Sequence, residues 1–162
     1  MKTNGITMKR LIFALVLGLA LVPWARGADV FVAQLTGAQE TPPNTSTATG
    51  LMVLVLNDAQ DTLSFRIDYQ GLVGTSTVGS HFHHGLPTVA GPVIRGYPAG
   101  PGMEFDVTDS SVVDRWTAND TQALTPDYIQ NLFDGELYFN IHTAPDYGGG
   151  EIRGQIIYWF SY

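Results

Sequence analysis

Histidine is the residue type in this sequence with the clearest capacity for chemistry. Three of the four histidines are His81, His83 and His84, and the fourth is His142. In an extended strand His81 and His83 point to one face, and His84 points to the other. Imidazole binds zinc and copper, and reactive metal sites commonly have three protein ligands. The spacing therefore indicates a metal site made by His81, His83 and His142, with copper or zinc as the candidate ion.

The fourth histidine joins this site only if its strand is a neighbour of the first. Alternate apolar residues from 137 to 141 form one face of the segment 137–143, which places His142 on the opposite, polar face. If the two strands pair, the three imidazoles converge. The alternative is that these are surface or interstrand histidines that make ordinary hydrogen bonds.

A second polar row follows the glycine-rich segment 147–150, predicted to be a turn. Glu151, Arg153 and Gln155 share one face of the next strand. Ligating imidazoles usually donate their other N–H to an acceptor, so Glu151 is a candidate acceptor behind one of the histidines. The alternative is an exposed ion pair between strands, worth under ~1 kcal/mol.

The elements that must position these residues are predicted to be antiparallel strands. Leu63, Phe65, Ile67 and Tyr69 alternate with polar residues and are expected to face the core. With the turn at 57–61, residues 50–70 form a hairpin. Further strands are predicted at 30–35, 137–143 and 152–160, and the arrangement of the histidines requires that 80–84 is extended too. Short antiparallel strands indicate an all-β sandwich or barrel.

One short helix is predicted near residues 126–134. Thr125 is a suitable N-cap, Pro126 a suitable first residue, and Gly135 a suitable stop. The helix is too short to be stable alone, so it must pack against the sheet. Residues 85–103 are rich in Gly and Pro and are predicted to be a long irregular loop.

The N-terminus predicts export. Basic residues precede an apolar run at 11–22 of about a dozen residues, shorter than the ~20 of a spanning helix, and small residues follow it. Residues 1–27 are therefore a predicted signal peptide, and residues 28–162 a single mature domain without a stable membrane anchor. The expected location is the periplasm or the cell exterior.

The charge of residues 28–162 excludes some partners. Four arginines and no lysine stand against fifteen acidic residues, a net charge of −11. Such a surface repels nucleic acids and anionic lipids and attracts cations. The chain has no cysteine, so disulfides do not contribute to its stability.

Four segments in this order resemble the CHRD domain, first described in chordin and widespread in bacterial exported proteins. They are residues 35–43 (LTGAQETPP), 81–83 (HFH), 137–143 (LYFNIHT) and 150–155 (GEIRGQ). The resemblance covers about residues 30–158 and implies an immunoglobulin-like β-sandwich or barrel. It also implies that His81, His83 and His142 occupy the family's usual histidine positions. Residues 106–121 are less typical, which leaves the topology there open.

Three classes of function are compatible with these features. The favoured one is a non-catalytic metal-binding or extracellular interaction module, whose partner is a metal ion or an extracellular protein. A copper-dependent redox enzyme is the second, because superoxide dismutases also carry an H-x-H pair on a β-sandwich. A purely structural domain is the third. The spacing shows no Ser-His-Asp or paired-carboxylate arrangement, so the sequence favours a protein that is not an enzyme.

The export prediction has a direct test. Small residues at Ala25 and Gly27 place the cleavage site before Ala28. The intact mass of the secreted product should therefore correspond to residues 28–162. A product that retains the apolar run at 11–22 would contradict cleavage and indicate a membrane anchor.

Overall fold

The computed structural model describes residues 27–97 and 111–161. The predicted signal peptide, except Gly27, and part of the predicted loop at 85–103 lie outside these residues. The described elements are β1 (Asp29–Thr36), the 3₁₀ turn η1 (Gly37–Gln39), β2 (Thr49–Leu56), β3 (Thr62–Gln70), β4 (Ser76–His84), β5 (Val93–Tyr97), β6 (Ser111–Thr117), α2 (Pro126–Phe133), β7 (Leu137–Ala144), β8 (Tyr147–Gln155) and β9 (Ile157–Ser161).

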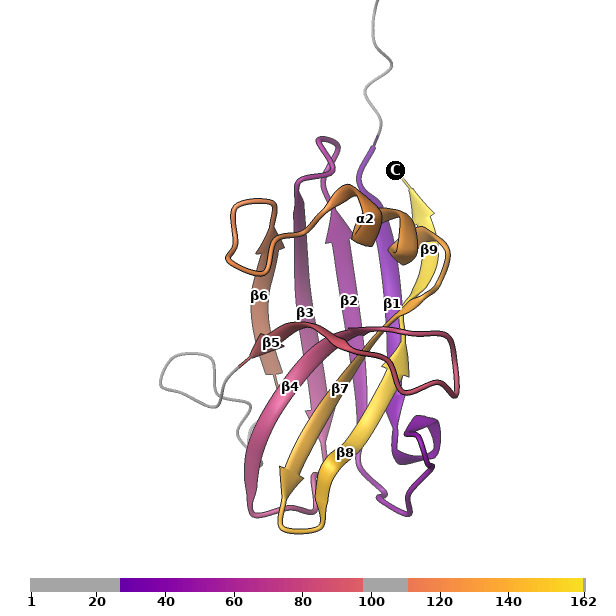
Figure 1. The fold of residues 1–162 in the computed structure, drawn as a ribbon, viewed down its shortest axis with the longest axis vertical. Coiled ribbons are helices and arrows are strands. Elements are labelled where there is room, and N and C mark those ends of the chain that lie inside the picture. The colour runs from indigo at the N-terminus through magenta and orange to yellow at the C-terminus, as the bar shows by residue number, and fades with distance from the viewer. Residues whose placement is uncertain (1–26, 98–110, 162) are drawn as a thin grey trace, which may run out of the picture.

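The strands form one antiparallel sheet in the order β5-β4-β7-β8-β1-β2-β3-β6, and β9 also pairs with β1. The sheet curls into a half-barrel, so that β4, β7 and β8 pass in front of the other strands in Figure 1. The Phe82 ring of β4 lies 5.3 Å from Phe65 of β3 and 5.2 Å from Trp116 of β6. One core therefore fills the curl. This confirms the all-β prediction, while the immunoglobulin-like strand arrangement stays a prediction.

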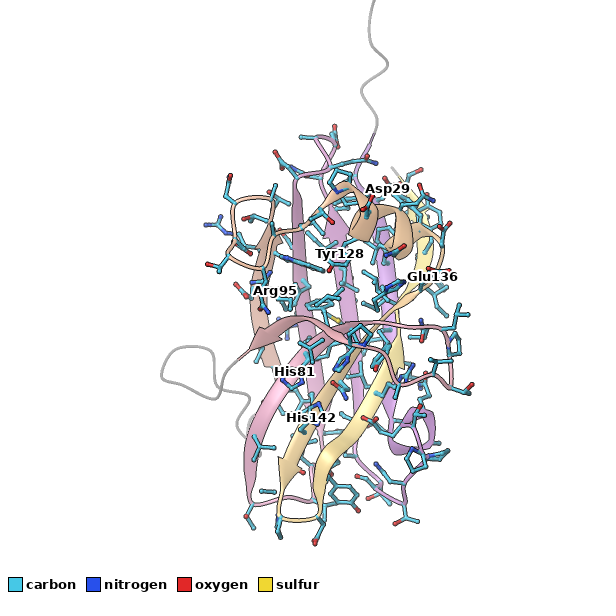
Figure 2. All side chains as sticks on the ribbon, in the orientation of Figure 1. Asp29, His81, Arg95, Tyr128, Glu136 and His142 are labelled. Atoms are coloured by element: carbon cyan, nitrogen blue, oxygen red, sulfur yellow. The ribbon has the colours of Figure 1, made fainter. Side chains whose placement is uncertain are left out.

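Side chains link the two ends of the sheet. Arg95 of β5 pairs with Asp114 of β6 at 3.3 Å and with Asp120 beyond it at 3.2 Å. Its guanidinium also lies 5.8 Å from the centre of the Trp116 ring. Figure 2 shows Arg95 at this meeting point. The largely buried Arg95 guanidinium, which lies between two carboxylates, thus joins the two edge strands of the curled sheet.

The predicted hairpin is confirmed. β2 and β3 pair along their whole length, from Thr49↔Gln70 to Leu56↔Leu63. The side chains predicted to face the core are all buried: Leu63, Phe65, Ile67 and Tyr69. Arg66 and Asp68, on the other face, are exposed and form an ion pair at 2.6 Å.

The predicted helix is also confirmed. The Thr125 hydroxyl accepts a hydrogen bond from the Tyr128 N–H at 3.3 Å, and Gly135 ends the helix at a φ of +70°. Ile129 and Leu132 are buried. Figure 1 shows α2 lying across one end of the sheet, which it closes.

The single strand predicted at 152–160 is wrong. β8 ends at Gln155, the Ile156 N–H donates to Leu137 O at 2.9 Å, and β9 begins at Ile157. Residues 151–156 are all buried and 157–160 are all exposed, so neither piece alternates. Because the end of β8 is buried on both faces and β9 is exposed, the sequence here lacks the period-two alternation from which strand boundaries are predicted.

Strands occur in the segment predicted to be an irregular loop and in the segment whose topology the sequence left open. The segment 85–103 includes β5, which pairs with β4, and the segment 106–121 includes β6, which pairs with β3. The predicted turn at 147–150 is the start of β8, and the chain reverses just before it. Glycine-rich sequence is typical of turns, but Gly96 lies within β5 and Gly148 and Gly149 lie within β8.

The hairpin register generates a stability prediction. Phe65→Ala should lower the free energy of unfolding by ~3–5 kcal/mol, because the Phe65 ring is buried against Phe82 and a cavity would remain. Denaturant titration measures this loss. The matched control is Arg66→Ala on the exposed face, which should cost under ~1 kcal/mol. A larger loss for Arg66→Ala than for Phe65→Ala would contradict the register.

Candidate metal centre

The strand pairing confirms that the two histidine-bearing strands are neighbours. β4 pairs with β7, and in this register His81 lies opposite Asn140 while His142 lies opposite Gly79. His83 lies opposite Tyr138. The three histidines therefore lie on the same face of adjacent strands, and Figure 2 shows His81 and His142 close together there.

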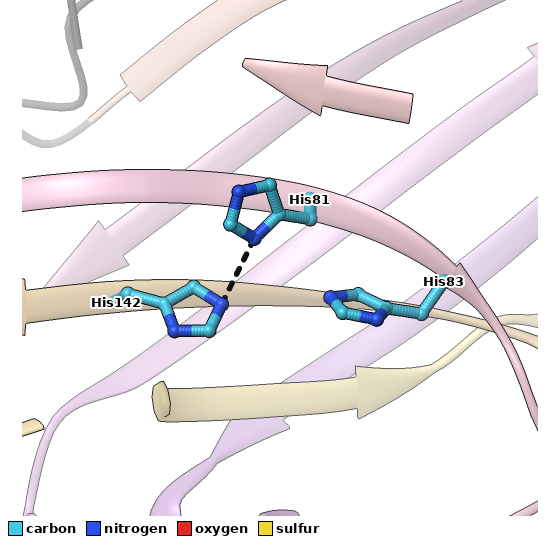
Figure 3. A group of neighbouring side chains, drawn as sticks. All are labelled: His81, His83 and His142. Atoms are coloured by element: carbon cyan, nitrogen blue, oxygen red, sulfur yellow. Dashed lines mark hydrogen bonds between the residues drawn. The ribbon is translucent and has the colours of Figure 1, made fainter. Parts of the chain in front are cut away.

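The three imidazoles converge. One ring nitrogen from each of His81, His83 and His142 lies within 4.8 Å of the other two. His81 Nδ1 and His142 Nε2 are hydrogen-bonded at 2.9 Å, the dashed line in Figure 3. In a tetrahedral zinc site the ligand nitrogens lie about 3.3 Å apart. The group of three converging histidines that the sequence predicted is thus present.

Backbone carbonyls select which nitrogen of two rings faces inward. His83 Nδ1 lies 2.9 Å from Gly91 O, and His142 Nδ1 lies 3.0 Å from Gly148 O. A carbonyl can only accept, so each Nδ1 carries the hydrogen and each Nε2 keeps its lone pair. This is the outer contact that orients ligating histidines in metal sites.

Gly91 reaches His83 because it lacks a side chain. A Cβ at this position would overlap the backbone carbonyl of His84. Only glycine therefore lets the loop after β4 fold back closely enough to place its carbonyl on His83 Nδ1.

The environment keeps the three rings neutral. Burial, reinforced by His142 and His83, lowers the pKa of His81 to about 4. Burial also lowers the pKa of His83 and of His142, against the opposing effect of their carbonyl partners. Neutral imidazole is the form that binds metals, so the rings are in the ligating state at neutral pH.

His84 lies apart from this group. Its Nε2 is 3.2 Å from a carboxylate oxygen of Glu136, and its side chain is 42% exposed. The strand geometry that turns His81 and His83 inward turns His84 away, as the sequence predicted.

The polar face around the histidines is buried beneath two loops. Arg153 on β8 is 2% exposed and donates to Thr41 Oγ1 at 2.9 Å, to Val89 O at 3.0 Å and to Leu86 O at 3.0 Å. Its guanidinium lies 3.4 Å from the centre of the Tyr138 ring, which in turn stacks on His83 at 4.6 Å. Arg153 thus fastens both loops above the site.

Glu151 belongs to a different network from the one predicted. Its carboxylate is fully buried and accepts hydrogen bonds from Ser46 Oγ at 2.7 Å, from Val73 N at 2.6 Å and from the Thr143 hydroxyl. The structure therefore does not bring Glu151 to the histidines, and it is not an exposed ion pair either. It ties the segments at 46 and 73 to the sheet.

Glu40 is a site residue that the sequence analysis missed. It is 6% exposed, and burial raises its pKa to about 7 against the opposing effects of Arg153, the Thr41 backbone and the Asn140 amide. The Glu40 carboxylate occupies the space that a Cβ at position 150 would fill. Position 150 is a glycine with a φ of +126°. A charged residue in an irregular polar segment carries no periodic signal of burial, so only the fold reveals it.

The pKa of Glu40 predicts an unusual pH dependence. The folded protein binds the Glu40 proton more tightly than the unfolded chain, so the stabilisation from Glu40 is full below pH 4.5 and is lost as pH rises through about 7. In metal-free protein, the unfolding free energy of the wild type should fall by about 2–3 kcal/mol relative to Glu40→Gln between pH 4.5 and 8. The histidines titrate in both proteins, so their contribution cancels. Parallel pH profiles of the two proteins would contradict the raised pKa.

None of the helices in the described parts of the chain is long and apolar enough to cross a membrane. In comparison with known proteins, no curated protein and no solved structure matches the chain. Residues 31–156 match the family described as the CHRD domain. This match spans most of the sequence and includes most of β1, all three clustered histidines and β8. The chain belongs to the CHRD domain family.

Proposed function

We propose that this CHRD domain is an exported, non-catalytic module that binds one copper or zinc ion through His81, His83 and His142. One observation carries the proposal. His83 and His142 both have Nδ1 bonded to a backbone carbonyl, so that both present Nε2 to the space faced by His81 Nδ1. Histidines with a purely structural role would not each have to direct a ring nitrogen toward the same space.

The electrostatics support the same proposal. The three rings are neutral at pH 7 because burial lowers the pKa of each, so no positive charge in the cluster repels a cation. The domain as a whole carries a net charge of −11, which raises the local concentration of divalent ions. Binding replaces the His81–His142 hydrogen bond, and the His81 proton then resides on its other nitrogen.

A non-catalytic role is favoured by what surrounds the rings. The Tyr138 ring lies between the His83 ring and the Arg153 guanidinium, Arg153 donates to three loop oxygens, and Glu151 is hydrogen-bonded in another network. These groups hold the protein together and are not free to move a proton for a substrate. Export is supported by the occurrence of CHRD domains in extracellular proteins.

The proposal predicts stabilisation by metal. Zinc or copper(II) at about 100 times its dissociation constant should stabilise the native state by ~2.7 kcal/mol and raise the melting temperature by about 6–10 °C. Differential scanning fluorimetry after chelator treatment measures this rise. His83→Ala should abolish it, because the cluster then keeps only two imidazoles.

His84→Ala is the matched control. His84 lies on the same strand as His83 but contacts Glu136 outside the cluster. This variant should keep the full rise in melting temperature. If the wild type gains nothing, or if His83→Ala keeps the gain while His84→Ala loses it, the cluster is not the binding site.

A further inference from the structure

The centre of the histidine cluster contains more hydrogen-bond acceptors than donors. His83 Nε2 and His142 Nε2 have lone pairs, because each ring donates from Nδ1 to a backbone carbonyl. The Asn140 side-chain oxygen, Oδ1, also faces them, 3.1 Å from His83 Nε2 and 3.0 Å from His142 Nε2. The one N–H directed into this space is that of His81 Nδ1. Asn140 Oδ1 thus lies about 3 Å from two nitrogens that also have lone pairs, and such acceptors repel one another unless a cation lies between them.

The same distances suit the coordination of one ion. Ligand atoms around tetrahedral zinc lie about 3.3 Å apart, and Oδ1 is that close to two of the three imidazoles already. Asn140 Oδ1 thus lies where a fourth ligand would lie, and not on the outer side of the three imidazoles.

Asn140 is held firmly in this position. It lies in β7 between His81 of β4 and Arg153 of β8, and it is 3% exposed. Its amide also interacts with the buried carboxyl of Glu40. In its ionised form, present above its pKa of about 7, the Glu40 carboxylate accepts from the amide N–H, which directs Oδ1 the other way, toward the imidazoles.

We infer that Asn140 Oδ1 is the fourth ligand of the proposed site, and that it makes the site selective for a divalent ion over copper(I). The inference rests on the proposed function, since it names a further ligand of the same ion. Three imidazoles and an amide oxygen form a neutral donor set that fills four positions. Amide oxygen is a hard ligand, so it strengthens binding of zinc or copper(II), whereas soft copper(I) gains little from it.

The test compares two substitutions with two ions. Asn140→Ala removes the oxygen and should weaken zinc binding at least about tenfold, measured by competition with a chelator of known affinity. Asn140→Asp keeps an oxygen at the same place and should bind zinc within about threefold of the wild type or more tightly. Copper(I) affinity, measured the same way under reducing conditions, should stay within about threefold in all three proteins.

Each contrary result has a distinct meaning. Equal loss of zinc and copper(I) affinity in Asn140→Ala, or equal weakening by Asn140→Asp and Asn140→Ala, would show that Asn140 only positions the histidines and would overturn the inference. Unchanged zinc affinity in Asn140→Ala would overturn it as well. Absence of zinc and copper binding by the wild type would instead overturn the proposed function.

A structure of the zinc-loaded wild type decides the matter if Asn140→Ala fails to fold. The inference requires a distance of about 2.0–2.2 Å from zinc to Asn140 Oδ1. A distance beyond about 3 Å, with three imidazoles bound, would leave the metal site intact and exclude Asn140 as its ligand.

Discussion

The buried guanidinium of Arg153 is the interaction on which the arrangement of the site depends. It bonds Thr41 in the loop before β2 and Leu86 and Val89 in the loop after β4, so one cation closes both loops over the same face of the sheet. A buried cation must have its donors satisfied, which makes these contacts obligatory rather than incidental. The loop after β4 then continues to Gly91, whose carbonyl selects the tautomer of His83.

Burial of a polar sheet face explains why the histidines are so strictly oriented. Most antiparallel sheets leave their polar face in water, where side chains can exchange partners freely. Here the loops bury Tyr138, Asn140 and Arg153, each of which has assigned partners, so His83 between them has little freedom to turn. Such a constrained donor set is what a metal site requires, because rings that are already in place lose little entropy on binding an ion.

The two buried glutamates show how position determines the role of a carboxylate. Glu151 lies where hydroxyl and backbone donors surround it, and it joins the segments at 46 and 73 to β8. Glu40 lies beside Arg153 and Asn140 with its Oε1 unpaired among the described residues, and burial raises its pKa. The groups that surround each carboxylate, rather than the residue type, thus decide its role.

The sequence by itself determined the period-two strands around residue 65, the helix with its Thr125 cap, and the shared face of His81 and His83, because these follow from local geometry. It could not determine which strand lies beside which, so the meeting of His142 with His81 was conditional until the pairing of β4 with β7 was known. The strand break at Ile156, the separation of Glu151 from the histidines and the burial of Glu40 were decided by tertiary structure alone. Each depends on contacts between residues far apart in the chain, such as Ile156 with Leu137 and Arg153 with Thr41.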